Sequence, residues 1–263
     1  MNILTGYNGF IGSHLANKIE NKFLLEKKDC FSFLLDFDNW KDVECVYHIG
    51  AISNTTETDV NKLYQYNVKF TLELFERCIE HKIPVKWVSS GSVFGNTFTN
   101  VGGRSINPLN QYAFSKAIVE QWVMDNLDRF ERFEGYRLFN VYGDGEADKG
   151  SQASPITIFR KQAVEEGVIR IFERSDAYLR DFVSVDDVVS VMTGDIRFHG
   201  IFDLGTSRVV SFEDVAKLVQ RKYGGIITEI PFPKHLKDKY QYYTRAQQHF
   251  NYRFKTVEEW LSL

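Results

Sequence analysis

Short apolar runs alternate with longer amphipathic stretches along the N-terminal half of the chain. Runs rich in β-branched and aromatic side chains predict strands, and apolar positions that recur every three or four residues predict helices. The predicted strands are a first one around Ile3 and Leu4 and then residues 22–26, 31–35, 44–49, 85–90 and 135–143, and the predicted helices are residues 10–19, 59–81 and 111–127. Because strand and helix alternate in this order, we predict an α/β protein with a doubly wound parallel sheet.

The alternation becomes less regular in the C-terminal half. Strands are predicted at residues 168–172, 201–205 and 226–230, with another that starts at Arg180 and leads into a helix, and helices at 155–166 and 212–223. We therefore predict two parts, a dinucleotide-binding domain over residues 1–143 and a smaller, mixed substrate-binding lobe over residues 144–263. Some strands and helices of the second part are expected to return to the first.

The first strand leads into three glycines, Gly6, Gly9 and Gly12, and a helix follows at once. Backbone N–H groups of such a turn, together with the positive end of the helix, bind a pyrophosphate. In this geometry Gly6 permits the tight turn, Gly9 has no side chain to block the phosphates, and Gly12 lets the helix pack close to the strand. The other predicted cofactor contacts of the turn are Asn8, Phe10 and Ile11.

Charged side chains after the strand at 22–26 bear on the choice of cofactor. Glu26 lies 20 residues after Gly6, where a dinucleotide fold has an acid for the adenosine ribose. Lys27 and Lys28 follow it and could instead meet a 2′-phosphate, or all three could form a solvated charge run, so these residues leave NAD and NADP open. Further predicted cofactor contacts, which follow later strands or lie on the next helix, are Asp36, Gly50, Ala51, Ser53, Asn67 and Val141.

Tyr112 and Lys116 lie at the start of the predicted helix 111–127. Residues four apart share one face of a helix, so the phenol and the ammonium point the same way. A phenol has a pKa near 10, and moving it to about 7 takes roughly 4 kcal/mol, which two nearby cations, Lys116 and an oxidised nicotinamide, can supply. Ser89 and Ser90 end the preceding strand, at the sheet edge where ligands bind. These residues predict a tyrosine base with a lysine partner and a serine hydroxyl beside the reacting oxygen of an alcohol.

Composition narrows the class of protein. The 263 residues carry a formal net charge of −3, with 43% apolar and 25% charged residues, which is ordinary for a globular protein and argues against a nucleic-acid partner. No apolar run is long enough to span a bilayer and no signal peptide is recognisable, so we expect a cytoplasmic protein without a membrane partner. The three cysteines, Cys30, Cys45 and Cys78, lack metal-ligand spacing, so we expect free thiols and no metal site.

These motifs together resemble one family. The stretch Thr5–Gly12, the pair Ser89-Ser90, the Tyr112-x-x-x-Lys116 motif and Arg180–Val183 look like the nucleotide-sugar enzymes of the extended short-chain dehydrogenase/reductases, the NAD-dependent epimerase/dehydratase family. Narrower stretches, which resemble the ADP-glyceromanno-heptose 6-epimerases, are residues 50–57, 139–143, 149–154 and 230–240. The resemblance extends from residue 1 to residue 255, and it implies a Rossmann fold and an isomerase that acts on a nucleotide-sugar, ADP-heptose.

The resemblance also implies roles for single residues. Tyr112 would be one acid/base catalyst, Lys116 its partner and a ribose ligand, Ser90 the catalytic serine, and Lys149 a second acid/base or a cofactor contact. The residues implied to line the nucleotide-sugar are Asn140, Ser151, Phe172 to Ser175, Arg180 and Tyr240.

The resemblance implies NADP as the cofactor, with NAD possible, because the family prefers NADP; this favours Lys27 or Lys28 over Glu26 as the discriminating contact. It also implies a homo-oligomer. The mechanism that follows is a hypothesis. Tyr112 removes the proton of a heptose hydroxyl while hydride passes to the nicotinamide, the ketone turns in the pocket, and the hydride returns to its other face.

Two alternatives remain open. One is another enzyme of the same fold, a nucleotide-sugar 4-epimerase or 4,6-dehydratase. A dehydratase usually has an acid pair after the catalytic serine, where this chain has Gly91 and Ser92. The other is a non-catalytic NAD(P)-binding regulator, which would not need Tyr112 and Lys116 together.

Overall fold

The computed structural model describes residues 1–96, 105–194, 197–234 and 240–262. The chain divides into two compact units, each assembled from segments that are far apart in the sequence. Unit 1 consists of Met1–Val93, Asn110–Arg137 and Val189–Phe202, and unit 2 consists of Phe94–Leu109, Leu138–Val188 and Asp203–Leu263. No helix in the described ranges combines the length and apolar character that a membrane crossing needs.

The central sheet of unit 1 has the strand order β2-β1-β3-β4-β5-β9 in the described part of the chain. Its strands are β1 (Asn2–Thr5), β2 (Lys22–Leu25), β3 (Cys45–His48), β4 (Val85–Ser90), β5 (Phe133–Leu138) and β9 (Gly200–Leu204). The chain passes from β1 to one side to form β2 and to the other side to form β3 and β4, with parallel pairing throughout. This arrangement confirms the predicted α/β fold with a doubly wound parallel sheet. The carboxyl ends of β1 and β3, where the direction of winding changes, form the usual ligand crevice of such a sheet.

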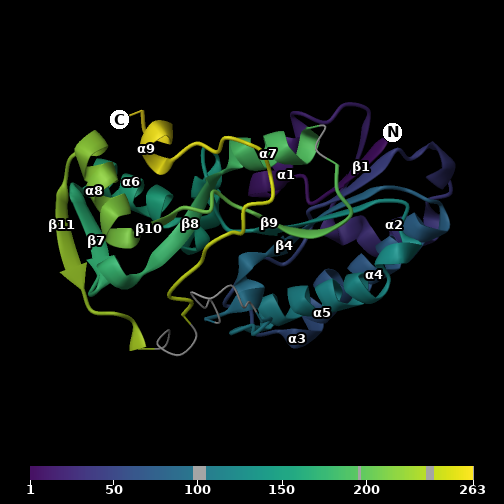
Figure 1. Ribbon diagram of the computed structural model, residues 1–263, viewed down its shortest axis with the longest axis horizontal. Helices are drawn as coiled ribbons and strands as arrows, with labels where there is room; N and C mark the ends of the chain where they lie inside the picture. Colours follow the sequence, from purple (N-terminus) through teal and green to yellow (C-terminus); the bar gives the residue numbers. More distant parts are fainter. Residues whose placement is uncertain (97–104, 195–196, 235–239, 263) are drawn as a thin grey trace. The chain divides into compact units, whose positions relative to one another are not determined.

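Helices cover this sheet, and α3, α4 and α5 pack on one side of it (Figure 1). The helices are α1 (Phe10–Ala16), α2 (Cys30–Asp36), α3 (Val60–Leu63), a π-helix (Tyr64–Lys69), α4 (Phe70–Glu80), α5 (Gln111–Asp125) and α7 (Val185–Thr193), with 3-10 turns at Lys27–Asp29, Trp40–Asp42, Gly91–Phe94 and Leu127–Arg129. The core between sheet and helices is apolar, with Val46 and Trp87 of the sheet against Leu74 and Phe75 of α4. Burial of such side chains contributes most of the stabilisation of this unit.

The predicted strand at 31–35 is wrong, because this stretch forms helix α2. Cys30, Phe33 and Leu34 are buried on one face, whereas Leu35 is 83% exposed. Spacings of three and four residues between buried positions are helical, and a short apolar run alone does not distinguish a helix from a strand. The consequence is that β2 has β1 as its neighbour and stands at the edge of the sheet in the described residues.

Unit 2 contains two small sheets, of order β10-β8-β6 and β11-β7 in the residues that the structure describes. Its strands are β6 (Asn140–Tyr142), β7 (Val168–Phe172), β8 (Leu179–Ser184), β10 (Val209–Ser211) and β11 (Ile226–Ile230). Its helices are α6 (Pro155–Glu166), α8 (Phe212–Tyr223) and α9 (Val257–Trp260). Two 3-10 turns, Glu146–Gln152 and Ser175–Ala177, belong to the same unit. The predicted helices at 155–166 and 212–223 and strands at 168–172 and 226–230 are confirmed. The predicted strand at 135–143 is instead divided into β5 and β6.

Candidate active site

The glycine turn after β1 has the backbone conformation that its glycines predict. Gly6 has a φ of +70°, and a Cβ atom added there would lie 2.5 Å from the Cα of Gly50. A Cβ atom on Gly12 would lie 2.0 Å from the carbonyl oxygen of Gly6, so helix and turn pack backbone against backbone. A Cβ atom on Gly9 would meet only the Gly6 oxygen, at 3.3 Å, so the space in front of Gly9 is open. This cradle fits the pyrophosphate of a dinucleotide.

A buried histidine holds the two sides of this cradle together. The Nδ1 atom of His48 is 2.7 Å from the Thr5 hydroxyl oxygen, and Nε2 is 2.9 Å from the Thr71 hydroxyl oxygen. The backbone N–H of Gly50 donates to the same Thr5 oxygen at 2.9 Å. His48 therefore links the end of β1 to the end of β3, where Gly6 and Gly50 meet.

Burial lowers the pKa of His48 to about 3, and the positive charge of Lys116 acts in the same direction. The unfolded chain has a histidine pKa near 6.5, so between pH 6.5 and 3 the unfolded state binds more protons, and stability is lost as the pH falls through this window. We expect His48 alone to lower the free energy of unfolding by roughly 3 kcal/mol between pH 7 and 4. Urea unfolding at several pH values should give a weaker pH dependence for His48→Gln than for the unchanged protein. Equal slopes would contradict this assignment.

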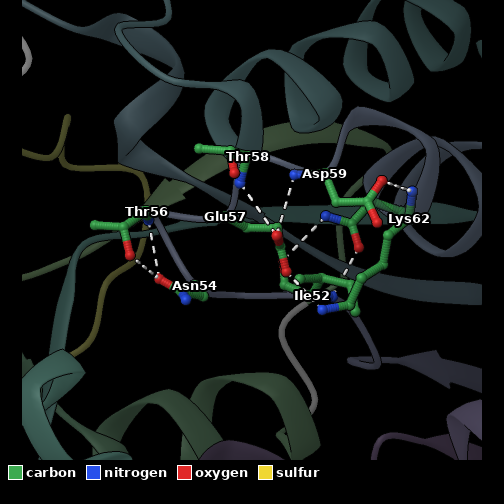
Figure 2. Close-up of polar contacts among 8 residues, drawn as sticks. Ile52, Asn54, Thr56, Glu57, Thr58, Asp59 and Lys62 are labelled. Carbon is green, nitrogen blue, oxygen red and sulfur yellow. Dashed lines mark hydrogen bonds and ion pairs between the residues drawn. The ribbon is translucent and has the colours of Figure 1, made fainter.

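The segment after β3 is folded by its own polar side chains (Figure 2). The Glu57 carboxylate accepts hydrogen bonds from the backbone N–H groups of Thr58 and Asp59, both at 3.1 Å, and from the Lys62 ammonium at 2.5 Å. These donors lower the pKa of Glu57. Asn54 accepts from the N–H and hydroxyl of Thr56 at 2.9 and 2.8 Å. The predicted contact Ser53 is exposed at the start of this loop.

Asn67 fixes the beginning of this segment. Its side-chain oxygen accepts from the Ile52 N–H at 2.7 Å, and its amide donates to the Ile52 carbonyl at 3.0 Å and to the Ser115 hydroxyl at 3.0 Å. Asn67 is 1% exposed and lies in the π-helix, a distortion that is frequent at functional sites. The side chain thus holds the backbone that follows Gly50 and Ala51, and its direct contact with a cofactor stays a prediction.

The charged residues predicted near the adenosine separate in the structure. The Glu26 carboxylate accepts from the backbone N–H of Asn8 at 2.9 Å and so lies at the glycine turn. The Lys27 ammonium lies 5.3 Å from the centre of the Tyr66 ring. Asp36 is the exposed last residue of helix α2, so the strand end that motivated its prediction does not exist.

Tyr112 lies in the first turn of α5, which begins where the Asn110 side chain accepts from the Ala113 N–H at 2.9 Å. Burial raises the pKa of the Tyr112 phenol, and a hydrogen bond with the Ser90 hydroxyl opposes this rise. Ser90 in turn accepts from the backbone N–H and the hydroxyl of Ser92, at 3.2 and 2.9 Å. Two donors on the Ser90 oxygen leave its own proton for Tyr112, which stabilises a phenolate.

Lys116 is buried one turn further along α5. Its ammonium donates to the Val88 carbonyl at 2.9 Å and lies 5.2 Å from the centre of the Trp87 ring. Burial lowers the pKa of Lys116 to about 7, and the carboxylate of Glu120 opposes this shift. Ser90, and not Lys116, is the group whose contact lowers the pKa of Tyr112, which differs from the expectation drawn from the spacing alone.

In unit 2, Lys149 pairs with a buried acid. Its ammonium lies 3.6 Å from an oxygen of Glu146, which is 1% exposed. Glu146 also accepts from the N–H and hydroxyl of Ser154, at 2.8 and 2.7 Å, and from the Thr157 hydroxyl at 2.6 Å. Burial lowers the pKa of Lys149 and Glu146 opposes this. A lysine with a lowered pKa is suited to proton transfer. The Ser151 side chain, predicted nearby, lies outside the described part of the structure.

The predicted substrate residues Arg180 and Tyr240 are neighbours. The Arg180 guanidinium lies 5.2 Å from the centre of the Tyr240 ring and 5.5 Å from that of Phe212, and it hydrogen-bonds to the Tyr240 hydroxyl. Phe172 contacts Phe232 at a ring distance of 5.3 Å within the same apolar cluster. A buried cation among aromatic rings is suited to hold a phosphate or a base. Predicted contacts that lie on β6 are Asn140 and Val141.

Residues that hold or surround the predicted side chains but were not themselves predicted include Glu120, Glu146, His48 and Ser92. Glu120 continues the spacing of four that relates Tyr112 to Lys116, so extending that spacing would have found it. No sequence pattern marked His48, because its partners Thr5 and Thr71 are 43 and 23 residues away. Glu146 lies in a short turn that has no helical or strand period to mark its burial.

Comparison with known proteins identifies a family and similar structures. Residues 32–195 match the model of the NAD dependent epimerase/dehydratase family. The chain is similar to the ADP-L-glycero-D-manno-heptose-6-epimerase of Alkalilimnicola ehrlichii, with 36% identity over 94% of this chain and 88% of the relative. The structure is similar to that of the enzyme of the same name from Helicobacter pylori, with a TM-score of 0.74 and 25% identity over 88% of this chain and 84% of the other. It also has the fold of the UDP-N-acetylglucosamine 4-epimerase from Methanobrevibacter ruminantium M1, with a TM-score of 0.83 and 18% identity over 99% and 95% of the two chains.

Proposed function

Because the chain belongs to the NAD dependent epimerase/dehydratase family, we propose that it is a nucleotide-sugar epimerase that inverts C6 of an ADP-glycero-manno-heptose. The observation that carries the proposal is the hydrogen-bonded series Ser92, Ser90 and Tyr112, in the same unit as the glycine cradle. The ADP-heptose substrate is supported by the relatives' names and by their match to most of this chain.

A bound nicotinamide supplies the reversible hydride acceptance on which such an epimerisation depends. The chain's own part is proton transfer. Tyr112 takes the proton of the C6 hydroxyl as the carbon loses hydride, and it returns the proton when hydride comes back to the other face of the ketone. Ser90 donates to the phenolate oxygen that carries the negative charge, and Lys116 keeps a positive charge nearby. In the absence of a bound cofactor burial opposes the phenolate, so the activated base depends on the positive cofactor.

Lys149 is proposed as a second group for proton transfer, held by Glu146 in unit 2. Arg180 with Tyr240 is proposed to hold the anionic, nucleotide end of the substrate, because an arginine offers several donors to phosphate oxygens.

Conversion of ADP-D-glycero-D-manno-heptose tests the proposal. The purified protein, without added cofactor, should give a mixture of the two C6 epimers, followed by NMR. If UDP-sugars are epimerised at C4 while the heptose is unchanged, the substrate class is wrong and the mechanism stands. If no sugar is converted although the protein releases a dinucleotide on denaturation, the epimerase assignment fails.

We propose NAD as the resident dinucleotide, contrary to the NADP that the resemblance implied. Glu26 lies at the glycine turn, where it accepts from the Asn8 N–H. An acid at this position of a dinucleotide fold is suited to accept hydrogen bonds from a ribose diol and to repel a 2′-phosphate. Mass analysis of the released cofactor is expected to give NAD, and Glu26→Ser should move the NAD/NADP preference toward NADP by about tenfold or more. Asp36→Asn, which changes an exposed acid on α2, serves as a control without effect. Release of NADP from the unchanged protein would contradict the assignment.

We also propose that two copies associate through α3, α5 and the start of the adjoining π-helix. Helices α3 and α5 are in contact, and they lie close together in Figure 1. Val60 and Tyr64, one turn apart, and Phe114 and Ile118, also one turn apart, are large apolar residues with exposed side chains. Light scattering is expected to give a dimer for the unchanged protein and a monomer for the Val60→Glu/Ile118→Glu variant, with Val164→Glu in unit 2 as a control that stays dimeric. A monomeric unchanged protein would rule out this interface.

A further inference from the structure

Strand β4 and helix α5 are joined by three polar contacts. The strand residues are consecutive, 88 to 90, and the helix residues, Tyr112, Lys116 and Glu120, are four positions apart. The Ser90 hydroxyl bonds to Tyr112, the Val88 carbonyl accepts from Lys116, and the Ser89 hydroxyl donates to Glu120 at 2.5 Å. Tyr112 and Lys116 were expected from their spacing. The third contact has no part in the reaction proposed above.

Four hydrogen bonds hold the Glu120 carboxylate. Its two oxygens accept three hydrogen bonds from Arg137, at 3.0, 3.0 and 2.8 Å, in addition to the one from Ser89. It is 3% exposed, so burying the carboxylate is costly and these hydrogen bonds offset that cost. Arg137 belongs to β5, so the carboxylate is fixed between helix and sheet.

The charge of Lys116 is the quantity that Glu120 influences. Residues four apart on a helix have their Cβ atoms roughly 5–6 Å apart, and the carboxylate favours the protonated lysine. Other titratable groups around Lys116 include the buried His48 on β3, which interacts with it, and Tyr112, four residues earlier on α5. Arg137 on β5 donates to Glu120 at 2.8 Å, so its positive charge offsets part of the effect of the carboxylate. Burial lowers the pKa of Lys116 to about 7, so the charges of Glu120 and Arg137 influence what fraction of Lys116 is protonated near neutral pH.

We propose that Glu120 and Arg137 form a positioning pair that aligns α5 with β4 and sets the charge of Lys116 beside Tyr112. The two members act in opposite directions: Glu120 stabilises the ammonium, and Arg137 limits how strongly it does so. The inference rests on the proposed function for the role of Lys116, but the charge of Lys116 can be measured without substrate.

The test is an NMR titration of protein labelled with ¹³C at the lysine ε-carbons, with the Lys116 signal identified by its loss in Lys116→Arg. In Glu120→Gln the midpoint of Lys116 should fall by about two pH units, the effect of one removed charge roughly 6 Å away at an effective dielectric constant near 20. In Arg137→Gln it should rise, because the carboxylate is then unshielded. A purely structural pair moves neither midpoint, or moves both in one direction, and either result overturns the proposal.

The matched control is Glu76→Gln. Glu76 makes an exposed two-pronged pair with Arg129 in the same unit, at 3.0 and 2.6 Å, and its removal should leave the Lys116 midpoint unchanged. If Glu120→Gln does not fold, Arg137→Gln alone decides, since only an electrostatic role gives an upward shift. Midpoints that shift in a protein without epimerase activity would support the pair and reject the function, whereas fixed midpoints in an active enzyme would do the reverse.

Discussion

Replacing Tyr112 by phenylalanine is expected to lower kcat for C6 epimerisation by roughly 10³-fold or more, with the dinucleotide still bound. The variant keeps the ring that is 9% exposed in the core and removes only the hydroxyl that exchanges the proton with substrate. The loss should therefore appear in kcat and leave the melting temperature nearly unchanged. Rapid mixing with substrate, followed through reduced nicotinamide absorbance, would locate the loss in the first proton and hydride transfer.

Two controls separate this effect from general damage. Ser90→Ala removes the donor to the phenolate but not the base, so it should lower kcat less than Tyr112→Phe and move the acid limb of the pH profile upward. Tyr64→Phe removes an exposed phenol of the same unit and should have no effect on kcat. Full activity in Tyr112→Phe would show that another group is the base.

Replacing Gly12 by alanine is expected to have the largest effect on stability. The added Cβ atom would lie 2.0 Å from the Gly6 carbonyl oxygen and 2.8 Å from its carbon, and both are backbone atoms of a turn that itself packs against Gly50. Neither side can move as a flexible side chain does, so helix α1 must shift from β1. We expect a loss of at least roughly 3 kcal/mol, measured by urea unfolding, and loss of the bound dinucleotide.

Gly9→Ala is the matched control, because its Cβ atom would meet only one protein atom within 4 Å, at 3.3 Å. Gly9 has a φ of −74°, which alanine adopts without strain. This variant should fold with nearly normal stability and yet lose the dinucleotide, since the added methyl group occupies the open side of the cradle. A Gly9→Ala protein that binds the dinucleotide normally would contradict the predicted place of the phosphates.

Two neighbouring stretches that were both predicted as strands, 22–26 and 31–35, had different outcomes. The predicted strand at 22–26 is present as β2, which ends at Leu25, and Glu26 follows it directly. This prediction succeeded because the apolar run and the spacing from Gly6 are local features. Phe31 to Leu35 was assigned to a strand, although its buried positions are helical, because an apolar run of five residues carries too little period to decide. The stretch is helical because its apolar face packs against α4, which is distant in the sequence.

Local sequence patterns were sufficient to predict the elements whose chemistry depends on residues a few positions apart. The spacing of Gly6, Gly9 and Gly12 requires a turn between strand and helix, and the spacing of Tyr112 and Lys116 puts both on one helix face, because the backbone geometry of each element relates residues a few positions apart. The groups that surround these residues are set by contacts between elements that are distant in the sequence. Glu120 with Arg137 and His48 with Thr5 are pairs made across elements, and the charge of a buried lysine depends on neighbours that no local pattern specifies. The cradle is therefore readable from sequence, whereas the electrostatic balance at Lys116 is a property of the fold.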